Sequence, residues 1–169
     1  IRDEILTYLI INNLEIKKEN INKSKNFALK NLINKAIKTN EINKFQIENY
    51  NKIDLGRYVE KVSKNLNVSS TELKNIFKIN NISYEAFIEK HITELKWNTL
   101  IFSLYKNQIN INIIEVENEI ESVKEDKDQE ELKKMKKNIL NRKKEEKLNL
   151  FSRSHFSNLE NSINIKFNE

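Results

Sequence analysis

The sequence predicts a mostly α-helical, multi-helix domain with a small two-stranded sheet that pairs its N-terminal and C-terminal segments. The 169 residues include no proline and one glycine, so helix breakers are few and the turn chemistry of all-β folds is largely missing. Apolar residues recur at three- and four-residue steps along much of the chain, which is typical of amphipathic helices. Residues 162–167 instead alternate apolar and polar side chains, the period of a half-buried strand.

The strand predicted at the C-terminal end needs a partner, because the N–H and C=O groups of a strand must be hydrogen-bonded. The other short β-like run is residues 2–7, at the opposite end of the chain. We therefore predict that the two ends pair. Helices must pack on this pair, because an isolated two-stranded pair is marginal in water. Residues 1–169 then form a single domain.

The first third of the chain predicts three helices. A short helix around residues 9–16 ends near residues 17–20, and apolar residues at helical spacing predict a stronger helix over residues 27–37. Residues 43–54 lose this period and are predicted to be a connection. Asp54 then caps a helix whose buried face runs from Leu55 to Leu66.

Two further helix starts follow closely. Ser69 and Glu72 have the spacing of a capping box, which opens a helix that presents Phe77 and ends at residues 80–81. Ser83 caps the next helix, predicted from Tyr84 to about residue 106. In its second half the apolar residues surround the helix, which is typical of a helix buried on more than one side.

The last third of the chain leaves two alternatives open. Residues 109–113 alternate briefly, and a helix is predicted from about Ile114. Residues 121–131 form an almost wholly charged seam, after which apolar spacing returns between residues 132 and 159. Either one helix passes through the charged seam as an exposed rod, or two helices meet there.

Composition excludes several classes of function. The chain has no cysteine, which removes disulfides, thiolate nucleophiles and cysteine metal sites. The net charge of +5 is mild, with lysine interleaved among glutamates. In the basic stretch 133–147, Glu145 and Glu146 interrupt the stripe that a nucleic-acid interface needs. The apolar runs are too short to span a bilayer. We predict no nucleic-acid partner and no membrane-spanning segment.

Catalytic chemistry has little support in the sequence. His91 and His155 lie on different predicted helices without the spacing of a metal site, and His91 continues an apolar face, which favours a core or boundary position. A single glycine leaves no Gly-rich phosphate loop. The sequence therefore predicts no catalytic residue, no metal and no cofactor.

Several stretches resemble, in order, the chaperone domain of the SurA-type periplasmic chaperones, which escort outer-membrane proteins. These stretches are residues 3–7 (opening strand), 28–38 (an early helix), 67–73 and 82–87 (two consecutive helix starts), and 139–146 with 162–165 (closing helix and strand). The resemblance covers nearly the whole chain. Each motif is mainly a packing pattern, so their order and spacing carry the resemblance.

The resemblance implies an ATP-independent periplasmic holdase for unfolded outer-membrane proteins, although no signal peptide is visible in this sequence. In that family, one or two parvulin-type prolyl isomerase domains precede the closing helix. Here only the charged seam 121–131 occupies that place, which is too short for a domain of about a hundred residues. Isomerase activity is therefore not expected, and we predict that the protein is not an enzyme.

Aromatic residues are the candidates for peptide binding: Phe77, Tyr84, Phe87, Trp97, Phe102 and Tyr105. Either each of them is plain core, or some line an apolar groove that stays partly open to unfolded clients or extended peptides. Burying one large client side chain contributes roughly 1.5–3 kcal/mol, so several such contacts bind without sequence specificity. The alternative function is a helical adaptor without chaperone activity, which binds one specific partner or self-associates, for example as a homodimer.

Overall fold

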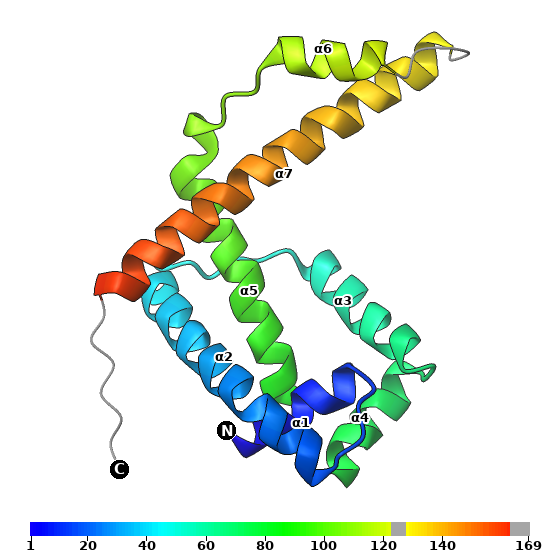
Figure 1. Cartoon of the computed structure of the whole chain (residues 1–169), viewed down its shortest axis with the longest axis vertical. Coiled ribbons are helices and arrows are strands. Elements are labelled where there is room, and N and C mark those ends of the chain that lie inside the picture. Colours follow the sequence, from blue (N-terminus) through cyan, green and yellow to red (C-terminus); the bar gives the residue numbers. More distant parts are fainter. Residues whose placement is uncertain (123–127, 163–169) are drawn as a thin grey trace. The chain divides into compact units, whose positions relative to one another are not determined.

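The computed structural model describes residues 1–122 and 128–162, and every regular element within those ranges is helical (Figure 1). The mostly helical character predicted from the sequence is confirmed. The chain divides into two compact units, Ile1–Leu100 and Ile101–Glu169. The single domain predicted over residues 1–169 stays a prediction. The elements in order are α1 (Arg2–Ile11), α2 (Lys18–Lys44), α3 (Lys52–Asn65), α4 (Ser70–Ile79), α5 (Tyr84–Tyr105), η1 (Lys106–Gln108), α6 (Ile113–Glu121) and α7 (Gln129–Ser162).

The prediction of a two-stranded terminal sheet is wrong. Residues 2–7 lie in α1, so their backbone groups are satisfied within a helix, and the structure holds no strand in residues 1–122 or 128–162. Asp3 and Glu4 stand in the first turn of α1, where negative charge complements the helix dipole. The apolar pattern of α1 is helical, since it buries Ile5, Leu6, Leu9 and Ile10. Residues 163–167 of the predicted closing strand lie outside the described residues.

Helix starts follow the local capping signals closely. The capping box is confirmed: the Glu72 N–H donates to Ser69 Oγ at 3.2 Å, and the Ser69 N–H donates to Glu72 Oε2 at 2.7 Å. Ser83 caps α5 as predicted, because its Oγ accepts the Ala86 N–H at 3.0 Å.

Two predicted boundaries in the first unit are wrong. Asn51, not Asp54, caps α3, and its Oδ1 accepts the N–H groups of Ile53 at 3.0 Å and Asp54 at 3.4 Å. Asp54 stands in the first turn instead. The short helix predicted around residues 9–16 ends earlier, at Ile11, so residues 17–20 lie at the start of α2 rather than at a helix end.

Helices α1 to α4 end with the same backbone arrangement. After each of α1 to α4 the chain adopts a left-handed residue, with φ between 52° and 54° at Asn13, Gln46, Asn67 and Asn81. The N–H of the next residue then donates back to a carbonyl inside the helix, as from Leu14 to Leu9 at 2.8 Å and from Ile82 to Phe77 at 3.0 Å. This is the Schellman arrangement, which usually employs glycine. Here asparagine supplies three of the four positions.

Two clusters of buried residues are part of the core of the first unit. The larger one joins α1, α3, α4 and α5 through buried Leu6, Ile10, Val62, Leu73, Phe77, Ile82 and Phe87. The smaller one fixes α1 against α2 through Ile5, Leu9 and Ala28. A partly buried charge network reinforces the same elements, because the carboxylate of Glu4 accepts hydrogen bonds from Lys90 on α5 and, at 3.2 Å, from Asn31 on α2.

The second unit contains two helices that meet at the charged seam, and not one continuous helix. α6 ends at Glu121, α7 begins at Gln129, and α6 folds back along α7 (Figure 1). Val116 and Ile139 are buried in this unit. Ion pairs link the two helices, with Arg142 bound to Glu119 and Lys143 Nζ lying 3.1 Å from Glu115 Oε2. Several basic residues of the 133–147 stretch are therefore neutralised by acidic partners on α6.

Candidate functional site

The six aromatic residues predicted to bind peptide do not form one surface. Phe77, Phe87 and Trp97 are buried, with at most 3 % of their surface exposed. Phe77 and Phe87 lie in the larger core cluster, with ring centroids 4.9 Å apart. Half-buried Tyr84 packs edge-on against Phe77 at 5.7 Å. The burial of Phe77, Phe87 and Trp97 fits the interpretation that these three residues belong to the core. Peptide binding by any of the six stays a prediction.

The other two predicted aromatic residues belong to the second unit. Tyr105 is half-buried, its ring stacks on Phe151 at 4.8 Å, and its hydroxyl lies 2.9 Å from Nδ1 of His155. Phe102 alone among the six is mostly solvent-exposed, at 51 %. These contacts anchor the start of the unit to α7.

A stacked pair of titratable rings lies in the first unit. Tyr58 on α3 and His91 on α5 stack with centroids 3.6 Å apart and an interplanar angle of 9°. Burial raises the pKa of Tyr58, and the negative charge of Glu4 adds to this. Burial lowers the pKa of His91, opposed by the charges of Glu94 and Asp54. Both rings are therefore held in their neutral forms, which suits a packing role at the boundary of the core.

Metal and membrane chemistry find no support in the part of the chain that the structure describes. Within residues 1–122 and 128–162, no group of three or more histidine, aspartate or glutamate side chains is placed to hold a metal ion. In the same ranges, no helix combines the length and apolarity that crossing a membrane requires.

An apolar groove opens in the first unit beside α1, and we name it the α1 groove. It has a volume of about 530 Å³ and takes its walls from α1, the connection after α1, the start of α2 and the end of α4. Its aliphatic lining residues are Ile1, Ile5, Leu6, Ile16 and Ile21, accompanied by Arg2, Lys25 and Asn80. Ile1 and Ile16 remain 64 % and 45 % exposed, so part of the aliphatic wall faces solvent.

Sequence reasoning missed the α1 groove because it placed residues 2–7 in a strand. The one available signal was the pair of apolar residues in the connection, Leu14 and Ile16, which a solvated loop does not need. The backbone of Leu14 completes the end of α1, since its N–H donates to the Leu9 carbonyl. The side chain of Ile16 lines the groove.

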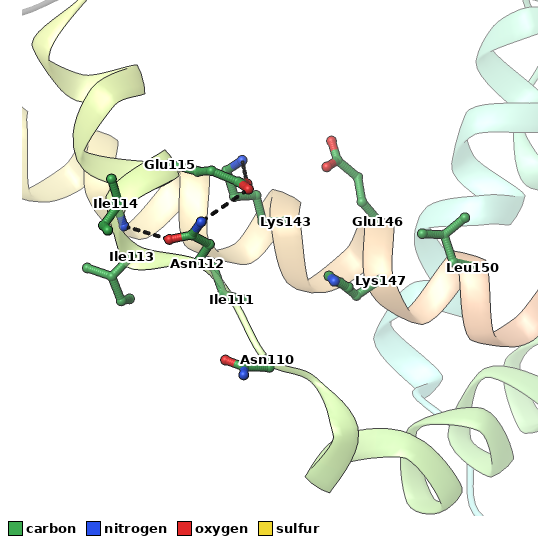
Figure 2. A pocket seen from close by; sticks show the side chains of 10 residues that line it. All are labelled: Asn110, Ile111, Asn112, Ile113, Ile114, Glu115, Lys143, Glu146, Lys147 and Leu150. Carbon is green, nitrogen blue, oxygen red and sulfur yellow. Dashed lines mark hydrogen bonds and ion pairs between the residues drawn. The ribbon is translucent and has the colours of Figure 1, made fainter.

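A second cleft lies in the second unit, between residues 110–115 and α7, and we name it the α7 cleft (Figure 2). Its volume is about 670 Å³, and Lys143, Glu146, Lys147 and Leu150 line it from α7. Figure 2 shows residues 110–112 running toward the start of α6 on the opposite side.

Polar contacts fix the upper end of the α7 cleft. Asn112 caps α6, with its Oδ1 accepting the Ile114 N–H at 3.0 Å and its Nδ2 donating to Glu115 at 3.4 Å (Figure 2). The ammonium of Lys143 donates to the other oxygen of Glu115, and this contact holds the pKa of the Glu115 carboxyl below its usual value. Aliphatic side chains remain exposed beside these contacts: Ile113 at 49 %, Ile114 at 67 % and Leu150 at 60 %.

Comparisons of this chain with protein-family models, with curated proteins and with solved structures found no match. The resemblance to SurA-type chaperones therefore stays a prediction. A function for this protein can be argued from the helical fold, the α1 groove and the α7 cleft.

Proposed function

We propose that the protein is an ATP-independent holdase, which binds apolar segments of unfolded polypeptides through the α1 groove. The observation that carries this proposal is the aliphatic wall of that groove, of which Ile16 is 45 % exposed. Isolated exposed apolar residues are ordinary on a protein surface, whereas a concave aliphatic lining is typical of ligand sites. A site of this kind needs no cofactor and no nucleotide.

The chemistry of the α1 groove suits apolar side chains. Its volume of about 530 Å³ lies within the usual range of ligand pockets. Contacts with its isoleucine and leucine side chains are non-directional, so they select for apolarity and not for sequence. Each large client side chain buried there would contribute roughly 1.5–3 kcal/mol, which gives a reversible complex when a few are engaged.

The proposed clients are unfolded outer-membrane proteins in the periplasm, in line with the SurA-type resemblance. Strands of such β-barrels alternate outward apolar residues with inward polar ones, so an unfolded barrel exposes many short apolar segments. A holdase with a small apolar groove would engage these segments one at a time and release them as the barrel folds.

The test is suppression of aggregation. An unfolded outer-membrane β-barrel protein is diluted out of urea with near-stoichiometric amounts of this protein, and light scattering is recorded. The Ile16→Asp variant should suppress aggregation much less, because a charge in the groove disfavours apolar binding. Ile53→Asp is the matched control, since Ile53 is 65 % exposed on α3 and does not line the groove.

Circular dichroism verifies that both variants are folded. Equal suppression by the two variants would remove the α1 groove from the proposal, and no suppression by the folded wild-type protein would reject the holdase function. A helical adaptor, the alternative function, would protect one partner and none of several unrelated unfolded proteins.

A further inference from the structure

The charged residues that line the α1 groove are all basic. Arg2 at the start of α1 and Lys25 on α2 stand beside its aliphatic wall, and no aspartate or glutamate lines it among the residues that the structure describes. The lining of the α7 cleft, in contrast, holds both signs of charge. A groove that presents apolar surface and positive charge together favours a ligand that carries apolar and negative groups together.

Helix periodicity places Lys25 at the edge of the groove. Lys25 stands four residues after Ile21 on α2, so the two residues share the face of the helix that lines the groove. The side chain of Lys25 is exposed. A lysine at such an edge can lay its methylene stem along apolar surface while its ammonium stays in water. Lys25 therefore adds positive charge to the groove without burial of that charge.

The acidic residues of α1, of the connection after it and of the first turn of α2 already have basic partners. Four ion pairs account for them: Asp3 with Arg2, Glu4 with Lys90, Glu15 with Lys17, and Glu19 with Lys23. Asp3 thereby offsets the charge of Arg2, whose guanidinium also donates to the Asn80 carbonyl at 3.5 Å. Lys25 makes no ion pair within residues 1–122 and 128–162, so its charge is available to a ligand.

An extended polypeptide segment can match both the apolar and the charged parts of the groove. Side chains two residues apart in an extended chain point to the same side and are about 7 Å from each other. A segment with an apolar residue at every second position therefore presents one apolar side to the aliphatic wall. An acidic residue that continues this alternation stands on the same side, where the edge of the groove carries Lys25.

We propose that the α1 groove prefers client segments in which an acidic residue continues an alternating apolar run, and that Lys25 binds the carboxylate. This inference rests on the proposed function and specifies which unfolded segments the holdase takes. Exposed ion pairs contribute modestly, so the expected preference over a neutral segment is about two- to fivefold in Kd. The aliphatic wall supplies most of the affinity, and Lys25 supplies the selection among apolar segments.

Three short capped peptides test the preference. Each has isoleucines at alternate positions separated by serine, and both ends of the alternation carry aspartate, asparagine or lysine. An uncharged fluorophore reports binding to the full chain by anisotropy. We expect the aspartate peptide to bind about two- to fivefold more tightly than the asparagine peptide, and the lysine peptide to bind most weakly. The difference between aspartate and asparagine should disappear near 1 M salt, where the Debye length is about 3 Å.

Variants of the protein separate the effect of the charge from that of the apolar wall. Lys25→Glu should reverse the order, so that the lysine peptide binds more tightly than the aspartate peptide. Lys30→Glu is the matched control and should keep the wild-type order, because Lys30 is also exposed on α2 and does not line the groove. Ile16→Ala should weaken all three peptides by the same factor, since it removes apolar surface and no charge.

The outcomes distinguish this inference from the holdase function. Equal binding of the aspartate and asparagine peptides to the wild-type protein would overturn the preference and leave the holdase function standing. An unchanged order in Lys25→Glu, or the same reversal in Lys30→Glu, would overturn the role of Lys25. Peptide binding that is insensitive to Ile16→Ala would assign the preference to another surface and so reject it for the groove. If no peptide binds, the α1 groove is not the client site and the inference fails with it, whereas suppression of aggregation tests the holdase function itself.

Discussion

Replacing Gln46 with glycine is expected to stabilise the protein, although the change removes a side chain. Gln46 stands after α2 with φ 54°, in the left-handed region that costs an L-residue roughly 1–2 kcal/mol. Glycine does not bear that cost, because it has no Cβ. The N–H groups of Gln46 and Ile47 donate to the carbonyls of Asn43 and Ile42, and glycine keeps both hydrogen bonds.

The size of the gain follows from two opposing effects. Glycine loses more backbone entropy on folding than other residues, which costs roughly 0.5–1 kcal/mol. Subtracting this from the relieved strain leaves a net gain between zero and about 1.5 kcal/mol. The side chain of Gln46 is exposed, so little contact energy is lost. For a chain of this size the middle of that range, about 0.75 kcal/mol, corresponds to a rise in melting temperature of about 1.5–3 °C.

The assay is urea unfolding followed by far-ultraviolet circular dichroism, with matched variants in parallel. Asn67→Gly should stabilise less, because asparagine tolerates the left-handed region better than glutamine does. Gln46→Val should destabilise, since a β-branched residue is poorly accommodated there. A Gln46→Gly protein that is no more stable than wild type, together with a neutral Gln46→Val, would refute the strain argument.

Three further predictions concern the first unit. Phe77→Ala should lower the free energy of unfolding by about 3–5 kcal/mol, because it empties a fully buried site. The control Phe102→Ala, at a half-exposed ring, should cost far less. Similar losses for the two variants in urea unfolding would contradict the core position of Phe77. Ser69→Ala should cost about 1 kcal/mol by removing half of the capping box, and Ser70→Ala, one residue along, should cost little. The pKa of His91 is lowered from 6.5, so the unfolded chain binds more protons near that pH and the free energy of unfolding should fall as pH drops through 6.5 toward the folded-state pKa. His91→Phe should flatten that fall, and an NMR titration midpoint of His91 above 6.5 would contradict it.

Local signals predicted the middle of the fold well. The Ser69–Glu72 pair and Ser83 each make their interactions within three residues, so a sequence pattern suffices to place the starts of α4 and α5. The apolar face of α3 was also predictable, since Val62 and its helical neighbours pack on the core. Capping and helical periodicity involve residues within about one helical turn of each other, so they can be recognised without knowing the distant elements.

The errors arose where two structures share one pattern. A short apolar run such as residues 5–10 fits either a strand or a helix, and packing of α1 against α2 and the larger core decided the matter. Asn51 and Asp54 are residues of the two types that cap helices well and stand about one turn apart, so sequence preference alone does not choose between them; in the structure Asn51 is the cap.

The candidate site was harder to predict than the fold. An aromatic residue at helical spacing looks the same whether it ends in a core or in a groove, because its burial depends on helices elsewhere in the chain. Phe77 and Phe87 are covered by residues from α1 and α3, which no pattern within α4 or α5 reveals. The α1 groove likewise draws its lining from four separate stretches of sequence.

Close packing between consecutive helices bears on how quickly the chain reaches its native state. The strongest helix contacts join α1 to α2, α3 to α4 and α6 to α7, each a pair of immediate neighbours along the sequence. Closing a short connection costs little loop entropy, so each pair can assemble before distant parts of the chain meet. Proteins rich in such local contacts fold in roughly microseconds to milliseconds. Helical hairpins could therefore form one after another while the ribosome is still extending the polypeptide, which would shorten the time that its apolar surfaces are open to aggregation.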